Sequence, residues 1–344
     1  MYRPTPWRVP PLLERIVVTA TDHAALLAWI AGTLGVREAR HAGTIQALWA
    51  GYGELFRIEL SDRPLRRAIV KWARPPRDED DVSAARKRRS FDVETTFYRT
   101  VAPRCDDTCR VPVLLAARGS ETIGEWVLVL EDLDAASYDL RLAEPAGAQL
   151  DAALAWLANF HARFLGEPVE GLWPQGTYWH LGTRLDELAA IDDAALRDAA
   201  PRIADRLATM RYPTLLHGDA KEANFCFTRT GADVAAVDFQ YVGHGCAMSD
   251  VAYLLYGRGD EPADGIDRPR LDTYFAHLRR ALARRPDAAT IDVTAVETEW
   301  RDLYVVARLD FCRFLAGWRP DMWRRDRRGQ RFVRGMLGRT VVSG

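Results

Sequence analysis

The 344-residue sequence lacks a disulfide framework, a secretory signal and a long apolar run. Its five cysteines are too few and too irregularly spaced for a disulfide-stabilised fold. Cys105 and Cys109 have no second pair at a complementary spacing, so they are interpreted as loop cysteines and not as a zinc site. Residues 1–10 are rich in proline and arginine instead of continuously apolar, and no stretch approaches about 18 apolar residues. We therefore expect a cytoplasmic protein without a membrane span.

The sequence also lacks an excess of either charge. Lysine and arginine number 47, aspartate and glutamate number 48, and the net charge of -1 gives no general reason to expect a nucleic-acid partner. The segment 319–339 is the exception, with eight arginines and two aspartates. Apolar residues interrupt these arginines, so we expect an amphipathic terminal helix packed on the core. A nucleic-acid-binding tail is the alternative.

Hydrophobic alternation predicts a β-rich first part of the chain. The predicted strands are 44–48, 55–60, 67–72, 112–116 and 126–130, the first three of them antiparallel. A turn is expected at 62–64. A front helix is predicted over 24–30, capped at Thr21–Asp22 and ending near Gly35. A second helix is predicted around 91–98, after a charged polar stretch at 74–90.

Beyond residue 133 the apolar periodicity becomes helical. One stripe is formed by Leu150, Leu154, Leu157 and His161. Further long amphipathic helices are predicted after residues 250, 270 and 293. The sequence thus predicts an α+β chain with an N-terminal extension and front helix (1–39), a β-rich part (40–133) and an α-rich part (134–344).

The most informative motif lies in the α-rich part. His217, Asp219 and Asn224 have the H-x-D-x-x-x-x-N spacing of a kinase catalytic loop, and Asp238 stands where a metal-binding Asp-Phe pair follows that loop. Asp219 would accept the proton of an acceptor hydroxyl, while Asn224 and Asp238 would supply oxygen ligands to Mg²⁺. His217 completes the catalytic set, and we expect it to brace the loop backbone.

Two residues close to this motif are assigned supporting roles. Lys221 is a candidate catalytic cation that would neutralise charge on the transferring phosphoryl group, with a solvated loop lysine as the alternative. Asp250 is predicted to be a helix N-cap with a structural role in holding the loop.

A lysine and a glutamate in the β-rich part are candidates for binding a nucleotide. Lys71 ends an alternating strand and would reach the α- and β-phosphates. Glu94, on the following helix, would be its ion-pair partner, with Asp92 as the rival because the helix register is open.

Backbone groups of the same part would complete the nucleotide site. Gly51 and Gly53 lie between two predicted strands, where two glycines allow the backbone to approach a phosphate closely. The strand leaving the β-rich part would offer backbone groups near Glu131 and Leu133 to an adenine ring.

At these residues the chain resembles the aminoglycoside phosphotransferase and choline kinase superfamily, and within it the ecdysteroid kinase-like group. The similar features are the motifs at 217–224 and 237–240, Glu94 with 97–98, and the segments 130–133, 157–162 and 310–314. The resemblance implies a bilobal protein-kinase-like fold with a small antiparallel N-lobe and a larger, mainly helical C-lobe. It also implies ATP and Mg²⁺ as cofactors, and phosphorylation of a hydroxyl on a small molecule. We expect a monomer or a homodimer.

Two departures from protein kinases narrow the substrate. Gln240 replaces the glycine of Asp-Phe-Gly, and no Ala-Pro-Glu signature follows, so a protein substrate is disfavoured. An aminoglycoside, a choline-like amine, a sugar and a steroid-like alcohol all stay open as acceptors. Trp173, Tyr178 and Trp179 would either line the acceptor pocket or pack in the core. A catalytically silent pseudokinase or scaffold is the alternative function, disfavoured because the expected catalytic residues are intact.

Overall fold

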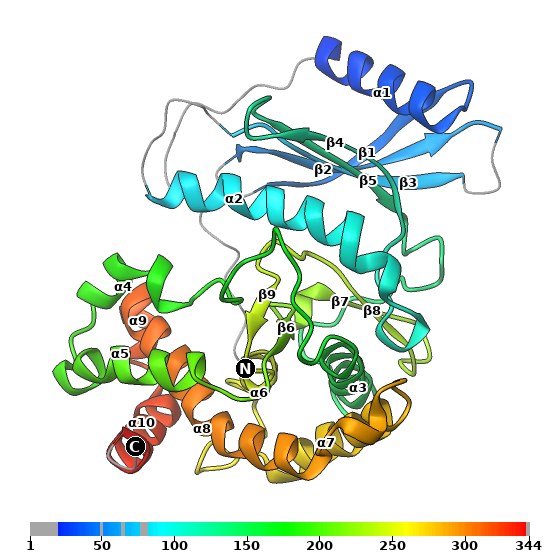
Figure 1. Cartoon of the computed structure of the whole chain (residues 1–344). Helices are drawn as coiled ribbons and strands as arrows, with labels where there is room; N and C mark the ends of the chain where they lie inside the picture. The colour runs from blue at the N-terminus through cyan, green and yellow to red at the C-terminus, as the bar shows by residue number, and fades with distance from the viewer. Residues whose placement is uncertain (1–19, 49–50, 63–65, 76–81, 342–344) are drawn as a thin grey trace.

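The computed structural model describes residues 20–48, 51–62, 66–75 and 82–341. The proline-rich segment 1–19 and residues 63–64 of the expected turn lie outside the described residues. Two parts follow one another along the chain, a β-sheet with two helices and a larger helical part (Figure 1).

The N-terminal part is a five-stranded antiparallel sheet. Its strand order is β1–β2–β3–β5–β4. The bounds are Ala39–Ala47 for β1, Gly53–Leu60 for β2, Arg67–Ala73 for β3, Leu114–Ser120 for β4 and Glu125–Glu131 for β5. All five predicted strands are confirmed. The boundary placed at residue 133 stays a prediction.

Alternation along the strands gives the sheet two different faces. On β2 and β3, Phe56, Ile58 and Val70 are buried against Leu26 and Ile30 of helix α1 (Ala20–Leu34). The predicted front helix is therefore confirmed, and it covers the outer face of the sheet (Figure 1). The predicted cap at Thr21–Asp22 was wrong, because both residues lie inside the helix. The side chain of Lys71 points to the opposite face from that of Val70, the residue before it in β3. It faces the helical part of the chain.

The opposite face of the sheet is covered by helix α2 (Val82–Thr96), which is followed by a π-helical turn, Phe97–Val101. The sequence prediction started this helix near residue 91, and this was wrong. The residues before Ser90 are mainly arginine, lysine and alanine, all good helix formers. The charged ones occupy the helix's more exposed positions, while Ala84 and Phe91 are buried. High polarity indicated an exposed segment, not the absence of a helix.

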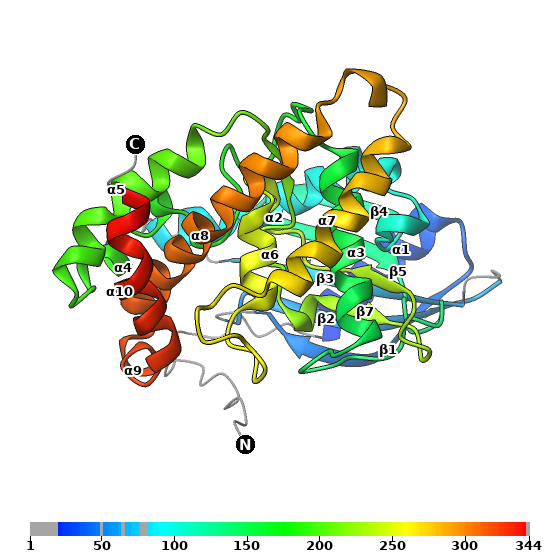
Figure 2. The ribbon, with the colours of Figure 1, turned by 90° about the horizontal axis from the view of Figure 1, so that it is seen from below.

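The C-terminal part is mainly helical. Its helices are α3 (Ala148–Arg163), α4 (Leu185–Ala189), α5 (Ala194–Ala208), α6 (Met248–Leu255), α7 (Arg268–Ala283), α8 (Val293–Trp318), α9 (Pro320–Trp323) and α10 (Arg327–Val341). Single 3₁₀ turns are formed by Ala102–Arg104, Asp107–Cys109, Leu181–Thr183, Glu222–Asn224 and Ala288–Thr290. Figure 2 shows α3, α6, α7 and α8 gathered in the middle of this part.

The predicted stripe on α3 is confirmed, since all four of its residues are buried in the main core. Helices α4 and α5 were not predicted, and α6, with 8 residues, is shorter than the long helix expected there. Four short strands carry the motif region. They are β6 (Thr214–Leu216) paired with β9 (Gly243–Gly245), and β7 (Phe225–Phe227) paired with β8 (Val234–Ala236).

The structure has the predicted fold class, α+β with a small antiparallel N-lobe and a larger helical C-lobe of the kinase-like type. All five cysteines are free thiols. Within the described part of the chain, no helix combines the length and apolar character that crossing a bilayer requires.

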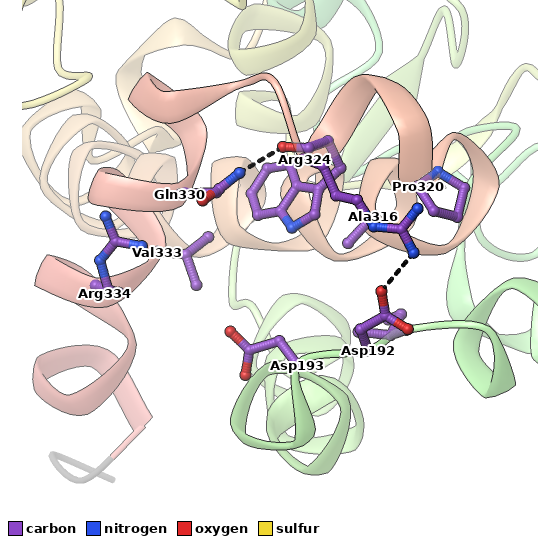
Figure 3. Close-up of a pocket in the computed structure, with 10 residues that line it drawn as sticks. Asp192, Asp193, Ala316, Pro320, Arg324, Gln330, Val333 and Arg334 are labelled. Atoms are coloured by element: carbon purple, nitrogen blue, oxygen red, sulfur yellow. Dashed lines mark hydrogen bonds and ion pairs between the residues drawn. The ribbon is translucent and has the colours of Figure 1, made fainter.

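The arginine-rich end of the chain is packed on the C-lobe. Phe332 and Val333 of α10 are buried, whereas Arg331 and Arg334 are exposed, as the amphipathic-helix prediction required. Figure 3 shows a small surface pocket of about 200 Å³ where α10 and α9 meet the start of α5. At this junction Arg324 lies 2.9 Å from Asp192, and the Gln330 amide donates to the Trp323 carbonyl at 2.6 Å.

Replacing Phe332 with alanine tests whether α10 is part of the folded core. We expect Phe332→Ala to lower the free energy of unfolding by about 3–5 kcal/mol, because it removes a buried ring. Arg331→Ala, the matched exposed neighbour, is expected to change it by about 0.5 kcal/mol or less. Urea unfolding of both variants measures the difference, and equal stabilities would contradict the packed helix.

Candidate active site

The loop between β6 and β7 is held by one buried carboxylate. Asp250 accepts hydrogen bonds from the backbone amides of His217 at 2.6 Å and Gly218 at 3.0 Å. Asp250 was predicted to be the N-cap of its helix, which is wrong, because α6 is capped at Ala247 and Asp250 lies in its first turn. Its carboxylate is thus free to hold the loop, the role that the sequence suggested for it.

His217 braces the loop from inside. Its ring is fully buried, Nε2 lies 3.0 Å from the carbonyl oxygen of Val237, and Nδ1 accepts from the Asp219 amide at 3.3 Å. This pattern requires the proton on Nε2. Burial lowers the pKa of His217, so the ring is neutral at pH 7 and acts as a rigid spacer between the two halves of the motif.

One carboxylate oxygen of Asp219 is engaged, and the other is not. Oδ2 accepts from Lys221 Nζ at 2.8 Å and from the Asn224 amide nitrogen at 3.1 Å. Oδ1 is buried without a hydrogen-bond partner among the described residues. Burial raises the pKa of Asp219, with Lys221 opposing the shift. An unsatisfied, buried carboxylate oxygen of raised basicity can accept a proton from a hydroxyl brought into the site.

A second set of charges connects the two lobes. Lys71 Nζ of β3 lies 2.7 Å from Glu94 of α2 and 2.9 Å from Asp238, which follows β8. Asp92, the rival to Glu94, instead accepts from Trp126 Nε1 at 2.7 Å. Burial alone would lower the pKa of Lys71, but Asp238 and Glu94 together outweigh burial and raise it. The lysine is therefore a permanent cation at the lobe interface.

Asp238 has an unusual backbone conformation. Its φ of 69° is left-handed, a region that costs a non-glycine residue about 1 kcal/mol or more. The next residue anchors the turn, since the Phe239 ring stacks on Phe97 with centroids 3.8 Å apart and lies 4.6 Å from the His217 ring. Burial would raise the pKa of the Asp238 carboxyl, but Lys71 and Lys221 outweigh burial and lower it, so the carboxyl stays ionised.

The donor set around Asn224 and Asp238 fits magnesium. The amide nitrogen of Asn224 makes its hydrogen bonds to Asp219, and Oδ1 of Asp238 makes the contact to Lys71. These contacts do not use Oδ1 of Asn224 or Oδ2 of Asp238. One amide and one carboxylate oxygen are hard donors of the kind that Mg²⁺ binds together with phosphate oxygens.

The four residues proposed to contact the nucleotide through backbone all have contacts inside the protein. A Cβ on Gly53, whose φ is 151°, would lie 1.9 Å from the carbonyl oxygen of Trp72, so the close approach of β3 already requires glycine there. The Gly51 amide donates to Leu48 at 3.0 Å. The Glu131 carboxylate binds Arg110 at 2.6 Å, and the Leu133 carbonyl accepts from Tyr138 at 2.9 Å. Contacts of these residues with a nucleotide stay predictions.

The aromatic segment before Thr183 is divided between core and site. Trp179 is fully buried with Phe311 and Phe314. Trp173 and Tyr178 are only partly buried and border the motif: the Trp173 indole donates to the Gln240 carbonyl at 2.8 Å, and the Tyr178 amide donates to Gly218 at 3.0 Å. Core packing thus accounts for Trp179, and a pocket role stays open for the other two.

Sequence reasoning missed three basic residues near this site. Lys87 lies two turns before Glu94 on α2 and donates to the Gln240 side chain at 3.2 Å. Burial lowers its pKa to about 8. A correct start for α2 would have placed Lys87 on the face that carries Glu94. Arg86 and Arg184 are far apart in the sequence, and no local pattern marks them.

The two-lobed fold, with a lysine held by two carboxylates and an aspartate on a braced loop, defines the class of kinase-like phosphotransferases. The chain belongs to the phosphotransferase enzyme family, whose model matches residues 44–287. No curated protein sequence gives a significant match.

Solved structures similar to this chain include three small-molecule kinases. A putative fructosamine-3-kinase from Thermobifida fusca YX-ER1 is 15% identical, with 93% of this chain and 99% of that chain covered and a TM-score of 0.49. A thermostable mutant of aminoglycoside phosphotransferase APH(4)-Ia, in a ternary complex with ADP and hygromycin B, is 12% identical, with coverages of 93% and 99% and a TM-score of 0.45. APH(2")-IIIa, in a complex with GDP and kanamycin, is 15% identical, with coverages of 92% and 98% and a TM-score of 0.44.

A glycine substitution tests how tightly the loop is held. A Cβ on Gly218, with φ 81°, would lie 2.0 Å from the Tyr241 carbonyl oxygen, whereas one on Gly257, with φ 72°, has nothing within 4 Å. We expect Gly257→Ala to cost only the left-handed strain of about 1–2 kcal/mol. Gly218→Ala adds a backbone clash and is expected to cost about 2–5 kcal/mol. Thermal unfolding compares the pair, and equal losses would show that the loop relaxes freely.

Proposed function

We propose that this protein transfers the γ-phosphoryl group of ATP to a hydroxyl of a small molecule. The observation that supports this best is the unpartnered, buried Oδ1 of Asp219, on the same motif as Asp238 and its contact to Lys71. The Asp219 carboxylate has an oxygen that can accept a proton, and the Asp238 carboxylate is neutralised by Lys71. Phosphoryl transfer needs this division of roles.

In the proposed mechanism Asp219 Oδ1 receives the proton of the acceptor hydroxyl. The acceptor oxygen forms a bond to the γ-phosphorus, and the bond from that phosphorus to the β–γ bridging oxygen breaks, so that ADP leaves with the electron pair. Lys71 binds the α- and β-phosphates. Lys221, held 2.8 Å from Asp219, offsets negative charge that develops beside the base.

Asn224 and Asp238 would hold Mg²⁺ in this mechanism. The ion would neutralise phosphate charge when it is bound. The protein's part is to keep the two oxygen donors in place. Asn224 is fixed through its bonds to Asp219, and Asp238 is fixed by Lys71 and the stacked Phe239.

The charge beside the motif favours a neutral or anionic acceptor. Arg184 lies over the Tyr178 ring at 5.7 Å, and Arg86 reaches across from α2 to the Thr183 carbonyl at 2.9 Å. Burial, with Arg86 adding to it, lowers the pKa of Arg184. Burial and the neighbouring arginines likewise lower the pKa of His180 to about 4, so it adds no charge at pH 7.

Arg184 is paired with Glu187 at 2.9 Å, so Arg86 adds its positive charge beside an ion pair. This charge disfavours an aminoglycoside or a choline-like amine and favours a sugar or a steroid-like alcohol, or an anionic derivative of either. The resemblance to the ecdysteroid kinase-like group points in the same direction and stays a prediction, as does the cytoplasmic location. The small pocket of Figure 3 includes no residue of the catalytic loop, β3 or α2 and is not assigned to the acceptor.

A screen of hydroxylated compounds with ATP and Mg²⁺, followed by ADP release, tests the function. We expect turnover with neutral or anionic alcohols in preference to polyamines. Asp219→Asn is expected to lower turnover by roughly 10²- to 10⁴-fold because the general base is lost, while ATP binding survives. Asp302→Asn, an exposed aspartate on α8, is the matched control and should leave turnover unchanged.

Unchanged turnover in Asp219→Asn would rule out this mechanism. ATP binding without turnover for any acceptor would instead favour the pseudokinase. A preference for polycationic aminoglycosides would overturn the acceptor class and leave the reaction type intact.

The pH dependence of ATP use tests the role of Lys87. Its pKa of about 8 means that the side chain is charged below pH 8 and loses its proton above it. If its charge attracts the phosphates, kcat/KM for ATP, which reports the free enzyme, falls as the pH rises through about 8. Lys87→Arg keeps the charge and should extend the plateau to higher pH, so the same alkaline decline in both proteins would exclude Lys87 as its source.

A further inference from the structure

A second cluster of ligand-type side chains lies on the outer face of the N-lobe sheet, away from the catalytic loop. It consists of His23 on α1, His41 on β1 and Glu54 on β2. One ligand atom from each residue lies within 4.8 Å of those of the other two. Among the described residues this is the only group of three or more His, Cys, Asp or Glu side chains with such a geometry.

An irregularity in β1 brings His41 to this face. His41 is opposite Ile58 and Thr44 is opposite Phe56, with a register shift between His41 and Gly43. Residues three apart in a regular strand face opposite sides, but the extra residue here lets His41 and Thr44 share the side of Phe56 and Glu54. The contact confirms this direction, since the His41 ring stacks on Phe56 at 5.0 Å. Bulges commonly re-aim a side chain toward a site.

Helix α1 supplies the third member from a position that would otherwise be apolar. His23 precedes Leu26 and Ile30 on the stripe that packs against the sheet. Its ring meets His41 edge-to-face at 5.2 Å and Trp72 at 5.5 Å. A histidine in this place brings a polar ring nitrogen to the edge of the apolar contact between α1 and the sheet.

The polar atoms of the cluster point at each other. His23 Nε2 and Glu54 Oε1 are in ion-pair contact, and both atoms are buried. The other Glu54 oxygen accepts from Thr44 at 3.3 Å, and the Thr44 hydroxyl also lies 3.5 Å from His41 Nε2. Thr44 thus orients two members of the cluster, as the outer partners of metal ligands do.

We infer that His23, His41 and Glu54 form a binding site for a divalent transition-metal ion of the zinc type. Two imidazoles and one carboxylate are a common protein donor set for Zn²⁺, with a water as the fourth ligand. Ligand atoms around such an ion are roughly 3–3.5 Å apart, as bond lengths of about 2.0–2.1 Å require. To reach this spacing His23 and Glu54 would separate slightly, and the exposed His41 side chain would move inward. The ion would fix α1 to the β1–β2 hairpin.

This site is separate from the phosphotransferase machinery. The family match begins at residue 44, so His23 and His41 lie outside it. On β2 and β3, Glu54 is paired with Trp72, whereas Lys71 is paired with Leu55 and faces the other side of the sheet. Metal binding at this cluster therefore does not depend on the proposed reaction.

Zinc binding by the tag-free full chain, stripped of metal with a chelator and kept in excess Mg²⁺, tests the site. Equilibrium dialysis and calorimetry should give one Zn²⁺ per chain for the wild type. His41→Gln and Glu54→Gln should each weaken binding by about tenfold or more. His277→Gln, a partly buried histidine on α7, is the matched control and should bind as the wild type does.

Two further readouts keep the result unambiguous. Zn²⁺ should raise the melting temperature of the wild type and of His277→Gln, but not that of the two cluster variants, because only a ligand of the folded state stabilises it. The Co²⁺ complex should lack a thiolate charge-transfer band, since the free cysteines are not ligands. Wild-type affinity in either folded cluster variant, or a thiolate band, would overturn the proposal. Because His41 is exposed, its variant is expected to fold even if Glu54→Gln does not.

Discussion

The contact of Lys71 with Glu94 and Asp238 is the interaction on which the two lobes depend. It joins β3, α2 and the segment after β8, three elements that no local sequence brings together. A buried lysine with one carboxylate is a neutral pair. With two carboxylates the group carries a net negative charge, which a metal ion beside Asp238 would offset. The same three residues therefore hold the lobes together and leave a defined place for phosphate and its counter-ion.

The catalytic loop is rigid because buried groups hold it from behind. Asp250 fixes the His217 and Gly218 amides, His217 connects the loop to Val237, and Phe239 stacks between His217 and Phe97. None of these groups needs to contact a substrate. They fix the backbone so that Asp219 has one oxygen engaged and one unengaged. Asp238 keeps its left-handed backbone conformation because the packing around Phe239 leaves the chain no relaxed alternative.

Much of this arrangement was predictable from sequence, and the errors have physical causes. Alternation located the five strands and singled out Lys71 at the end of one of them, and motif spacing selected Asp219 and Asp238. Glu94 could not be separated from Asp92 until the helix register was known, and the indole of Trp126 makes that distinction. Charged residues before Ser90 concealed the start of α2, and Lys87 with it. Arg86 and Arg184 meet only through tertiary packing. His41 and Glu54 share a face because of a bulge, and an irregularity of one residue leaves no clear periodic signal.

The two faces of one sheet separate two kinds of chemistry. Neighbouring residues of β3 point in opposite directions, so Lys71 meets Glu94 and Asp238 while Trp72 lies against His23. An ion on the outer face would not touch a nucleotide. Its effect would be to hold α1, β1 and β2 in one arrangement and so fix the strand on which Lys71 is mounted. Because a packed sheet moves as a unit and does not deform residue by residue, stabilising the outer face limits the freedom of the lysine on the inner face.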